Sequence, residues 1–254
     1  MGKQTIDLSG KVAIVTGGTR GLGRGIADAL SQAGASVVVC GRREPDDLPA
    51  GVRFRAADIR EADQAAALVE AVVEDHGRLD ILVNNAGGSP EAPAATASSR
   101  FFDAIVRLNL NAAMYMSQAA HAPMQAAGAG SIVNIASVSG IRPSPGTAAY
   151  GAAKAGLLNL TQSLAQEWGP DGIRVNALIL GLMQTETSQL TYGETEAQAR
   201  VGASMPLGRM GTGQDAAGAV LWLCSEMASW ISGARINVDG GGERPYFLDL
   251  VKGN

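Results

Sequence analysis

The sequence predicts a three-layer α/β fold built on one doubly wound parallel sheet of about seven strands. Short runs of β-branched and aliphatic residues alternate along the chain with longer stretches whose apolar residues recur at helical spacing. This alternation is typical of βαβ units. The chain has 254 residues and no linker rich in proline, serine or charge. One domain over residues 1–254 is therefore the simplest organisation.

The elements follow from this alternation. The expected strands are the short apolar or alternating runs at residues 12–15, 37–40, 52–56, 81–83, 132–135, 173–180 and 235–238. Helical spacing indicates helices that include residues 22–30, 65–73, 109–127, 150–168 and 216–223. The segment at about 185–205 breaks the rhythm, because it is polar and rich in Thr, Gln and Glu. Long insertions of this kind are usually functional, so we expect a substrate lid there.

Composition narrows the class of protein. Lys and Arg number 20 and Asp and Glu 24, a formal net charge of −4, which argues against binding to nucleic acid or an anionic membrane. No apolar run reaches the roughly 18 residues that span a bilayer. Cys40 and Cys224 belong to no Cys-x-x-Cys motif, which favours a reducing, cytoplasmic compartment. Two isolated histidines predict no metal site.

The first strand runs into a glycine-rich turn, Thr16-Gly17-Gly18-Thr19-Arg20-Gly21-Leu22-Gly23, and a helix follows. Gly17 permits a tight turn, and Gly21 and Gly23 let the backbone approach a pyrophosphate at the helix N-terminus. The spacing is G-x-x-x-G-x-G rather than G-x-G-x-x-G, and a structural loop is the alternative. The position between a strand and a helix favours dinucleotide binding.

The end of the second strand indicates which dinucleotide binds. An acidic residue there would accept hydrogen bonds from the ribose 2′-hydroxyl of NAD(H). This chain has Gly41-Arg42-Arg43 instead, and Arg20 lies in the nearby turn. Guanidinium groups bind phosphate bidentately. We therefore expect NADP(H) rather than NAD(H), although arginines that merely solvate the surface are the alternative.

At this point the chain resembles the short-chain dehydrogenase/reductase family, in its one-domain branch of about 250 residues. The resemblance rests on Thr16–Gly23, on Asn84-Asn85-Ala86-Gly87, and on Tyr150-Gly151-Ala152-Ala153-Lys154, with a serine 13 residues before Tyr150. It implies a Rossmann-type fold and an oxidoreductase that acts on CH–OH and C=O groups. The enoyl reductase branch has a wider spacing than the three residues that separate Tyr150 from Lys154.

The chemistry of these residues agrees with that implication. A tyrosine four residues before a lysine lies on the same helix face. A neighbouring ammonium and an oxidised nicotinamide favour the phenolate and lower the tyrosine pKa from about 10, so Tyr150 can act as acid and base. Ser137 stands at a strand's carboxyl end, where ligands bind in such sheets, and can polarise a carbonyl.

The resemblance implies further roles. Lys154 tunes Tyr150 and binds ribose, and Asn109 holds the water of a proton relay. Ser139 and Asn111 are the respective rivals of Ser137 and Asn109. The expected cofactor contacts are Gly17, Thr19, Arg20, Gly21, Leu22, Gly23, Arg42, the adenine pair Asp58 and Ile59, Asn84, Ala86, Gly87, Tyr150, Lys154, Gly181, Met183 and the carboxamide ligand Thr185. The expected substrate contacts are Ser137, Ser139, Tyr150 and Tyr192. Leu180 replaces the family's proline before Gly181, which predicts a somewhat looser loop.

The substrate is less well defined. The expected pocket residues are Ser139, Ile141, Thr147, Leu182, Met183, Leu190, Tyr192 and Met205. This set is mostly apolar and without a fixed charge, so we expect a neutral, hydrophobic ketone or secondary alcohol. The alternatives are a 3-oxoacyl thioester of acyl carrier protein or CoA, and a dinucleotide-binding sensor without catalysis. An acidic carrier needs basic residues near the site, and Arg174 is the only match.

The C-terminal tail, 243–254, contains two aromatic and three aliphatic residues. Such a segment is costly to leave in water, so we expect it to pack against a neighbouring subunit. The Ala-rich helices at 109–127 and 150–168 could supply flat faces for a homotetramer or homodimer, as such helices do in this family.

Overall fold

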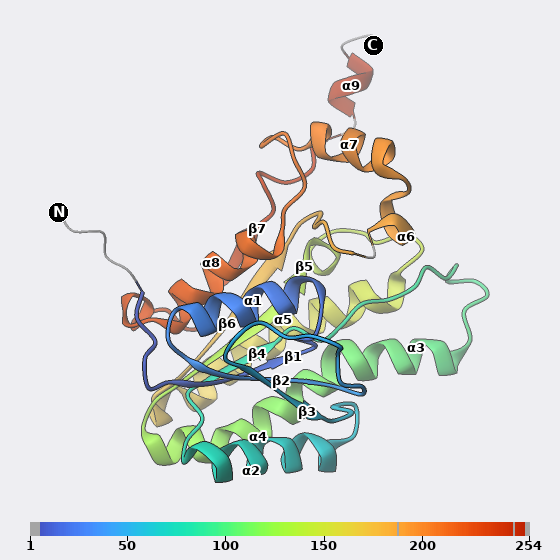
Figure 1. The fold of residues 1–254 in the computed structure, drawn as a ribbon. Coiled ribbons are helices and arrows are strands. Elements are labelled where there is room, and N and C mark those ends of the chain that lie inside the picture. The colour runs from blue at the N-terminus through green and yellow to red at the C-terminus, as the bar shows by residue number, and fades with distance from the viewer. Residues whose placement is uncertain (1–5, 187, 246, 252–254) are drawn as a thin grey trace, which may run out of the picture.

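The computed structural model describes residues 6–186, 188–245 and 247–251 (Figure 1). The strands are β1 Val12–Thr16, β2 Ser36–Gly41, β3 Val52–Ala56, β4 Ile81–Asn84, β5 Gly130–Ser137, β6 Ile173–Leu180 and β7 Arg235–Val238. The helices are α1 Gly21–Gln32, α2 Ala62–His76, α3 Ser99–Val106, α4 Ala112–Ala127, α5 Ala148–Trp168, α6 Gln189–Tyr192, α7 Thr195–Ser204, α8 Gly213–Cys224 and α9 Phe247–Val251.

The seven strands form one parallel sheet in the order β3-β2-β1-β4-β5-β6-β7. The chain winds outward from β1 to β3 and then returns to place β4 on the other side of β1. Val15 of β1 is in register with Val39 of β2 and with Val83 of β4. Ligands of open parallel sheets bind at the carboxyl ends of the strands beside such a reversal. The predicted doubly wound sheet is confirmed.

Helices cover both faces of the sheet. On one face, α1 and α8 pack on alternate strand residues such as Val15, Val37 and Val39. On the other face, α2, α4 and α5 pack on Ile14, Val38 and their neighbours (Figure 1). Burial of both faces explains why the central strands are almost continuously aliphatic.

Two features differ from the predicted helices. The helix expected from residue 109 begins as a π-helix at Arg107–Asn111, and the unpredicted α3 precedes it. The polar segment at 185–205 contains α6 and α7, and residue 187 lies outside the described part.

In the tail, α9 lies beyond α7, apart from the sheet (Figure 1), and residues 246 and 252–254 lie outside the description. None of the helices in the described ranges is long and apolar enough to cross a membrane.

Candidate active site

The glycine-rich turn joins β1 to α1 at the carboxyl edge of the sheet. Gly17 and Gly21 have φ angles of +62° and +55°, a backbone region that favours glycine. A Cβ on Gly23 would lie 2.4 Å from the Gly17 carbonyl oxygen and 2.4 Å from Asn85 Nδ2. The helix can therefore start this close to the strand only because residue 23 has no side chain.

The start of α1 is the positive end of the helix dipole and attracts an acidic side chain. Its N-cap residue, Arg20, makes no side-chain capping hydrogen bond. The Gly21 N–H donates instead to Glu186 Oε1 at 3.2 Å. A helix N-terminus that attracts a carboxylate is also suited to a phosphate.

Two asparagines at the end of β4, Asn84 within the strand and Asn85 after it, connect this turn to the pocket. Asn85 Nδ2 donates to the Thr16 carbonyl oxygen at 2.9 Å, and Thr16 Oγ1 accepts the N–H groups of Asn85 and Ala86, both at 3.0 Å. The Asn84 side chain is buried and donates to Asn134 Oδ1 at 2.9 Å. The sequence prediction names Asn84 and misses Asn85, which lines the pocket. Asn85 could have been found from its position in the motif Asn84-Asn85-Ala86-Gly87.

Ser137, Tyr150 and Lys154 converge at the carboxyl end of β5. Ser137 ends β5, and the other two lie one turn apart on α5. The Ser137 hydroxyl lies close enough to Tyr150 to favour its ionised form and accepts the Ser139 N–H at 3.2 Å. Lys154 Nζ donates to the Ile135 carbonyl oxygen at 2.7 Å and lies 5.5 Å from the Tyr150 ring centroid. The arrangement places a phenol, a hydroxyl and an amine around one point.

Burial dominates the acid–base properties of this group. Desolvation raises the pKa of Tyr150, although the nearby Ser137 hydroxyl acts in the opposite direction. Desolvation also lowers the pKa of Lys154 to about 8. The expected lowering of the tyrosine pKa is therefore not found in the protein alone, because the loss of hydration of the phenolate outweighs the favourable neighbours.

Asn109 holds the loop at Gly88, which forms part of the pocket wall. It is buried in the π-helix, and its Nδ2 donates to the carbonyl oxygens of Gly88 and Ile105, both at 2.9 Å. Its Oδ1 accepts the Gly88 N–H at 2.8 Å. π-helical turns occur frequently at functional sites. Asn109, rather than its rival Asn111, thus clasps the loop at Gly87 and Gly88, and its role in a water relay stays a prediction.

These elements enclose a cavity of about 390 Å³. Predicted residues that line it are Leu22, Gly87, Ser137, Ser139, Thr147, Tyr150, Lys154, Gly181, Leu182, Met183, Thr185 and Tyr192. Residues that the prediction missed are Asn85, Gly88, Ser89, Ile135, Ala136, Val138, Arg142, Leu180, Ser188 and Thr191. The other predicted contacts lie in the glycine turn or at the carboxyl ends of β2, β3 and β4. Those in the turn are Gly17, Thr19, Arg20, Gly21 and Gly23, and those at the strand ends are Arg42, Asp58, Ile59, Asn84 and Ala86.

Four expectations about the pocket are wrong. Ile141 and Leu190 are 52% and 88% exposed and do not line it. Met205 is buried against a neighbouring cavity. The pocket also has a fixed charge, because the Arg142 side chain is part of its wall. The neutral substrate was expected because the predicted pocket held no fixed charge, and the Arg142 guanidinium, considered by itself, contradicts that expectation.

Comparison with known proteins agrees with this geometry. A family model described as "Enoyl-(Acyl carrier protein) reductase" matches residues 17–243. A tropinone reductase homolog of Arabidopsis thaliana is 37% identical over 92% of each chain. The 3-oxoacyl-[acyl-carrier-protein] reductase FabG of Chlamydia muridarum is 35% identical over 92% of this chain and 98% of its own. This chain belongs to the short-chain dehydrogenase/reductase family.

A solved structure of this family bears on the cofactor. A protein from Beutenbergia cavernae, described as an NAD(P)-dependent gluconate 5-dehydrogenase with bound NADP at low occupancy, is 34% identical, with a TM-score of 0.85 over 93% of this chain and 98% of its own. The chain is thus an oxidoreductase of a family that binds NAD(P). The enoyl reductase in the name of the family model is not predicted here, because only three residues separate Tyr150 from Lys154.

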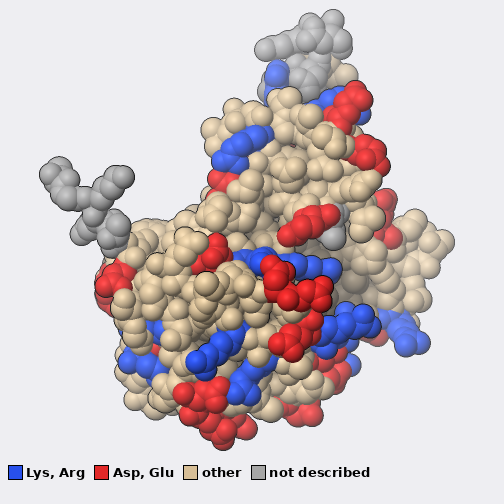
Figure 2. Space-filling model, in the orientation of Figure 1, with Lys and Arg blue, Asp and Glu red and all other residues tan. Residues whose placement is uncertain are grey.

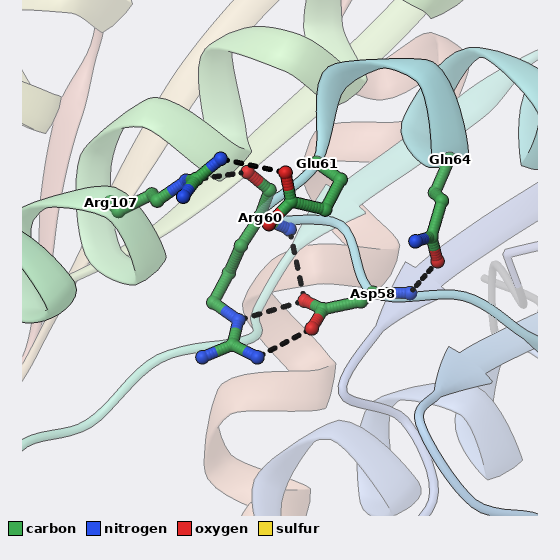
Figure 3. A network of polar contacts seen from close by, with 5 residues as sticks. All are labelled: Asp58, Arg60, Glu61, Gln64 and Arg107. Carbon is green, nitrogen blue, oxygen red and sulfur yellow. Dashed lines mark hydrogen bonds and ion pairs between the residues drawn. The ribbon is translucent and has the colours of Figure 1, made fainter.

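The expected adenine end of this short-chain dehydrogenase/reductase lies after β3. Asp58 Oδ1 accepts from Arg60 Nε at 2.8 Å, and the Asp58 N–H donates to Gln64 Oε1 at 2.9 Å (Figure 3). The Arg60 hydrogen bond lowers the pKa of the Asp58 carboxyl group, and Arg42 adds a smaller favourable charge. The Ile59 side chain is buried in the core. Asp58 is therefore held in place by Arg60, close to one of the arginines expected to bind a phosphate.

The backbone also fits a nicotinamide dinucleotide. A Cβ on Gly87 would lie 2.6 Å from Asn109 Oδ1, and a Cβ on Gly181 would lie 2.7 Å from the Asp239 Cα. Both glycines line the pocket. Gly87 and Gly181 thus lie against Asn109 and Asp239 where no side chain fits, so backbone forms the pocket wall on the side where the nicotinamide is expected.

Proposed function

We propose that this protein transfers a hydride between NADP(H) and a ketone or secondary alcohol, with Tyr150 as the acid and base. The observation that carries this proposal is the convergence of Ser137, Tyr150 and Lys154 on a pocket that opens beside the glycine turn. A phenol beside a serine hydroxyl at a strand end is placed to exchange a proton with a substrate oxygen.

The glycine turn and the start of α1 would hold the pyrophosphate, Lys154 the ribose, and Gly181 and Thr185 the nicotinamide side. When bound, the dinucleotide supplies the hydride donor or acceptor. In the direction of reduction, Ser137 donates a hydrogen bond to the carbonyl oxygen and Tyr150 gives that oxygen its proton. In the direction of oxidation, the same tyrosine removes the proton from the alcohol.

The NADP(H) preference rests on Arg20 and Arg42, which are both exposed, and on the absence of an acidic side chain at Gly41. Arg42→Gln should weaken NADPH binding at least about tenfold and leave NADH binding nearly unchanged, since a charge-assisted phosphate contact is lost. Fluorescence titration with both nucleotides measures this difference. Arg53→Gln, which removes an exposed arginine from β3, is the control. An unaltered preference in Arg42→Gln would contradict the proposal.

The substrate proposal remains a neutral, largely hydrophobic ketone or secondary alcohol. Apolar groups such as Leu22, Leu182 and Met183 form much of the wall. The Arg142 guanidinium is already paired with the Glu243 carboxylate, so it offers no net charge to an incoming molecule. Turnover of a panel of ketones and alcohols by the wild type, with Tyr150→Phe as control, tests the reaction. Equal activity of Tyr150→Phe would refute the role of Tyr150, whereas NADP(H) binding by the wild type without turnover of any substrate would favour a non-catalytic sensor.

A carrier-bound 3-oxoacyl thioester is the alternative, since one relative bears that name. The basic residue on which this alternative rested, Arg174, lies far from the site in this structure. Arg174 lies near the start of β6, whereas the site lies at Leu180, the end of the same strand. Six residues of strand separate them by roughly 20 Å. Arg174 thus lines a different cavity at the amino ends of the strands.

For the remaining properties we propose a cytoplasmic homotetramer or homodimer with small-molecule partners only. Cys40 and Cys224 are buried free thiols, as expected in a reducing compartment. Acidic side chains intersperse the Lys and Arg residues on the face in Figure 2, which does not favour nucleic acid. Phe247 and Val251 of α9 are 60% and 79% exposed, as a subunit contact would require.

A further inference from the structure

An ion pair joins the pocket wall to the root of the C-terminal tail. Arg142 follows the turn after β5, and Glu243 follows the glycines after β7, 101 residues later. Arg142 Nη2 donates to Glu243 Oε1 at 2.8 Å, and Arg142 Nε lies 2.5 Å from Glu243 Oε2. Both nitrogens of one edge of the guanidinium thus meet one carboxylate, which is the bidentate geometry of strong Arg–carboxylate pairs.

Both charges act on the inside of the pocket. Arg142 lines the cavity together with Tyr192, which ends α6 in the segment at 185–205. Desolvation is the largest influence on Tyr192 and raises its pKa; the charge of Glu243 raises it further, and that of Arg142 lowers it. The pair is therefore close enough to a pocket side chain to affect a charged group there.

We propose that the Arg142–Glu243 pair sets the charge specificity of the substrate pocket, with Glu243 as the residue that excludes carboxylate-bearing substrates. The proposal rests on the proposed function, whose pocket it refines. An unpaired arginine in the wall would bind a substrate carboxylate bidentately. Glu243 occupies that edge of the guanidinium, and an incoming carboxylate meets a like charge before it can replace it.

The two side chains are each 39% exposed, so solvent screens the pair. Glu243 therefore weakens the binding of carboxylate-bearing substrates without abolishing it. In Glu243→Gln the Arg142 guanidinium keeps its positive charge but loses the carboxylate that neutralises it. The ratio of kcat/KM for an acid to kcat/KM for its methyl ester should then rise at least about tenfold. In the double variant Arg142→Gln/Glu243→Gln that gain should disappear, because the positive charge is gone as well.

The probes are straight-chain hydroxy acids and their methyl esters, assayed for turnover with NADP+ and for thermal stabilisation of the protein–NADP+ complex. Asp75→Asn is the matched control: it breaks the Arg55–Asp75 pair, which has the same 2.5 Å separation and exposures of 39% and 37%. That pair joins β3 to α2, and its loss should leave the acid-to-ester ratio unchanged.

Several results would overturn the inference. A wild type that prefers acids to their esters would contradict it directly. So would a Glu243→Gln variant whose acid-to-ester ratio of turnover and of stabilisation stays at the wild-type value, or a gain that persists in the double variant. If no hydroxy acid and no methyl ester is turned over, the proposed reaction fails. The role of the Arg142–Glu243 ion pair is still decided by whether acids raise the Tm of Glu243→Gln more than that of the wild type.

Discussion

The glycine turn allows a quantitative prediction, because Gly23 has no room for even one methyl group. In Gly23→Ala the new Cβ would lie 2.4 Å from the Gly17 carbonyl oxygen and 2.4 Å from Asn85 Nδ2. The backbone oxygen cannot rotate away, so either α1 or the turn has to shift. Overpacking of this kind costs about 1–3 kcal/mol.

Displacement of the Asn85 amide adds to this cost. It donates to the Thr16 and Gly17 carbonyl oxygens at 2.9 and 3.3 Å, and each such hydrogen bond contributes about 1 kcal/mol net. Alanine recovers about 1 kcal/mol through its higher helix propensity. The net expectation for Gly23→Ala is a loss of about 3 kcal/mol in the free energy of unfolding. For a chain of this length that corresponds to a Tm lower by about 6–9 °C.

The matched control is Gly218→Ala in α8, where the added Cβ meets no atom within 4 Å. The same substitution there should stabilise the protein by about 0.5–1 kcal/mol. Urea unfolding measures both variants, and NADPH fluorescence titration should show at least about tenfold weaker binding for Gly23→Ala alone, because its turn no longer presents the backbone to the phosphates. Equal stability and equal NADPH affinity in the two variants would refute the reasoning.

Three further predictions concern other parts of the chain. Burial lowers the pKa of Lys154 to about 8, so between pH 8 and about 10.5 the unfolded chain keeps a proton that the folded protein has lost. The stability of the wild type relative to Lys154→Met should therefore rise over that range, as measured by urea unfolding at a series of fixed pH values. A stability difference that does not change with pH would contradict this prediction. Asp215 accepts the Thr212 N–H at 2.7 Å at the start of α8 and pairs with Arg209, so Asp215→Asn should cost about 1–2 kcal/mol by urea unfolding, whereas wild-type stability would count against a capping role. Deletion of residues 245–254 should reduce the oligomer size measured by light scattering, and an unchanged size and activity would remove the tail from the subunit contact.

Local patterns made most of the fold and the catalytic group predictable. Each predicted strand is present. The central strands are buried on both faces and therefore show a nearly continuous aliphatic run, whereas the edge strands β3 and β7 alternate polar and apolar residues. The spacing of Tyr150 and Lys154 is likewise a local property of one helix. The π-helix at Arg107–Asn111 has no such signature, since it depends on how Asn109 clasps the distant Gly88.

Properties that depend on distant neighbours could not be predicted. Asn84 and Asn85 are adjacent, but the first continues β4 opposite Asn134 and is buried, while the second leaves the strand and reaches the glycine turn. The raised pKa of Tyr150 comes from burial, which the sequence predicts only indirectly. The pairing of Arg142 with a residue 101 positions away left no pattern at all, and so the charge in the pocket wall was missed.

This division explains why the reaction class is clearer than the substrate. The reaction needs a glycine turn, a serine at a strand end and a tyrosine–lysine pair, and every one of these is fixed by local backbone geometry that similar chains share. The substrate is selected by side chains that meet from separate loops, such as Arg142 and Glu243, where one substitution changes the charge of the wall without disturbing the sheet. Relatives that are 35% and 37% identical to this chain indeed carry the names of different reductases. The charge balance of this one ion pair is therefore a more direct guide to the substrate than overall similarity.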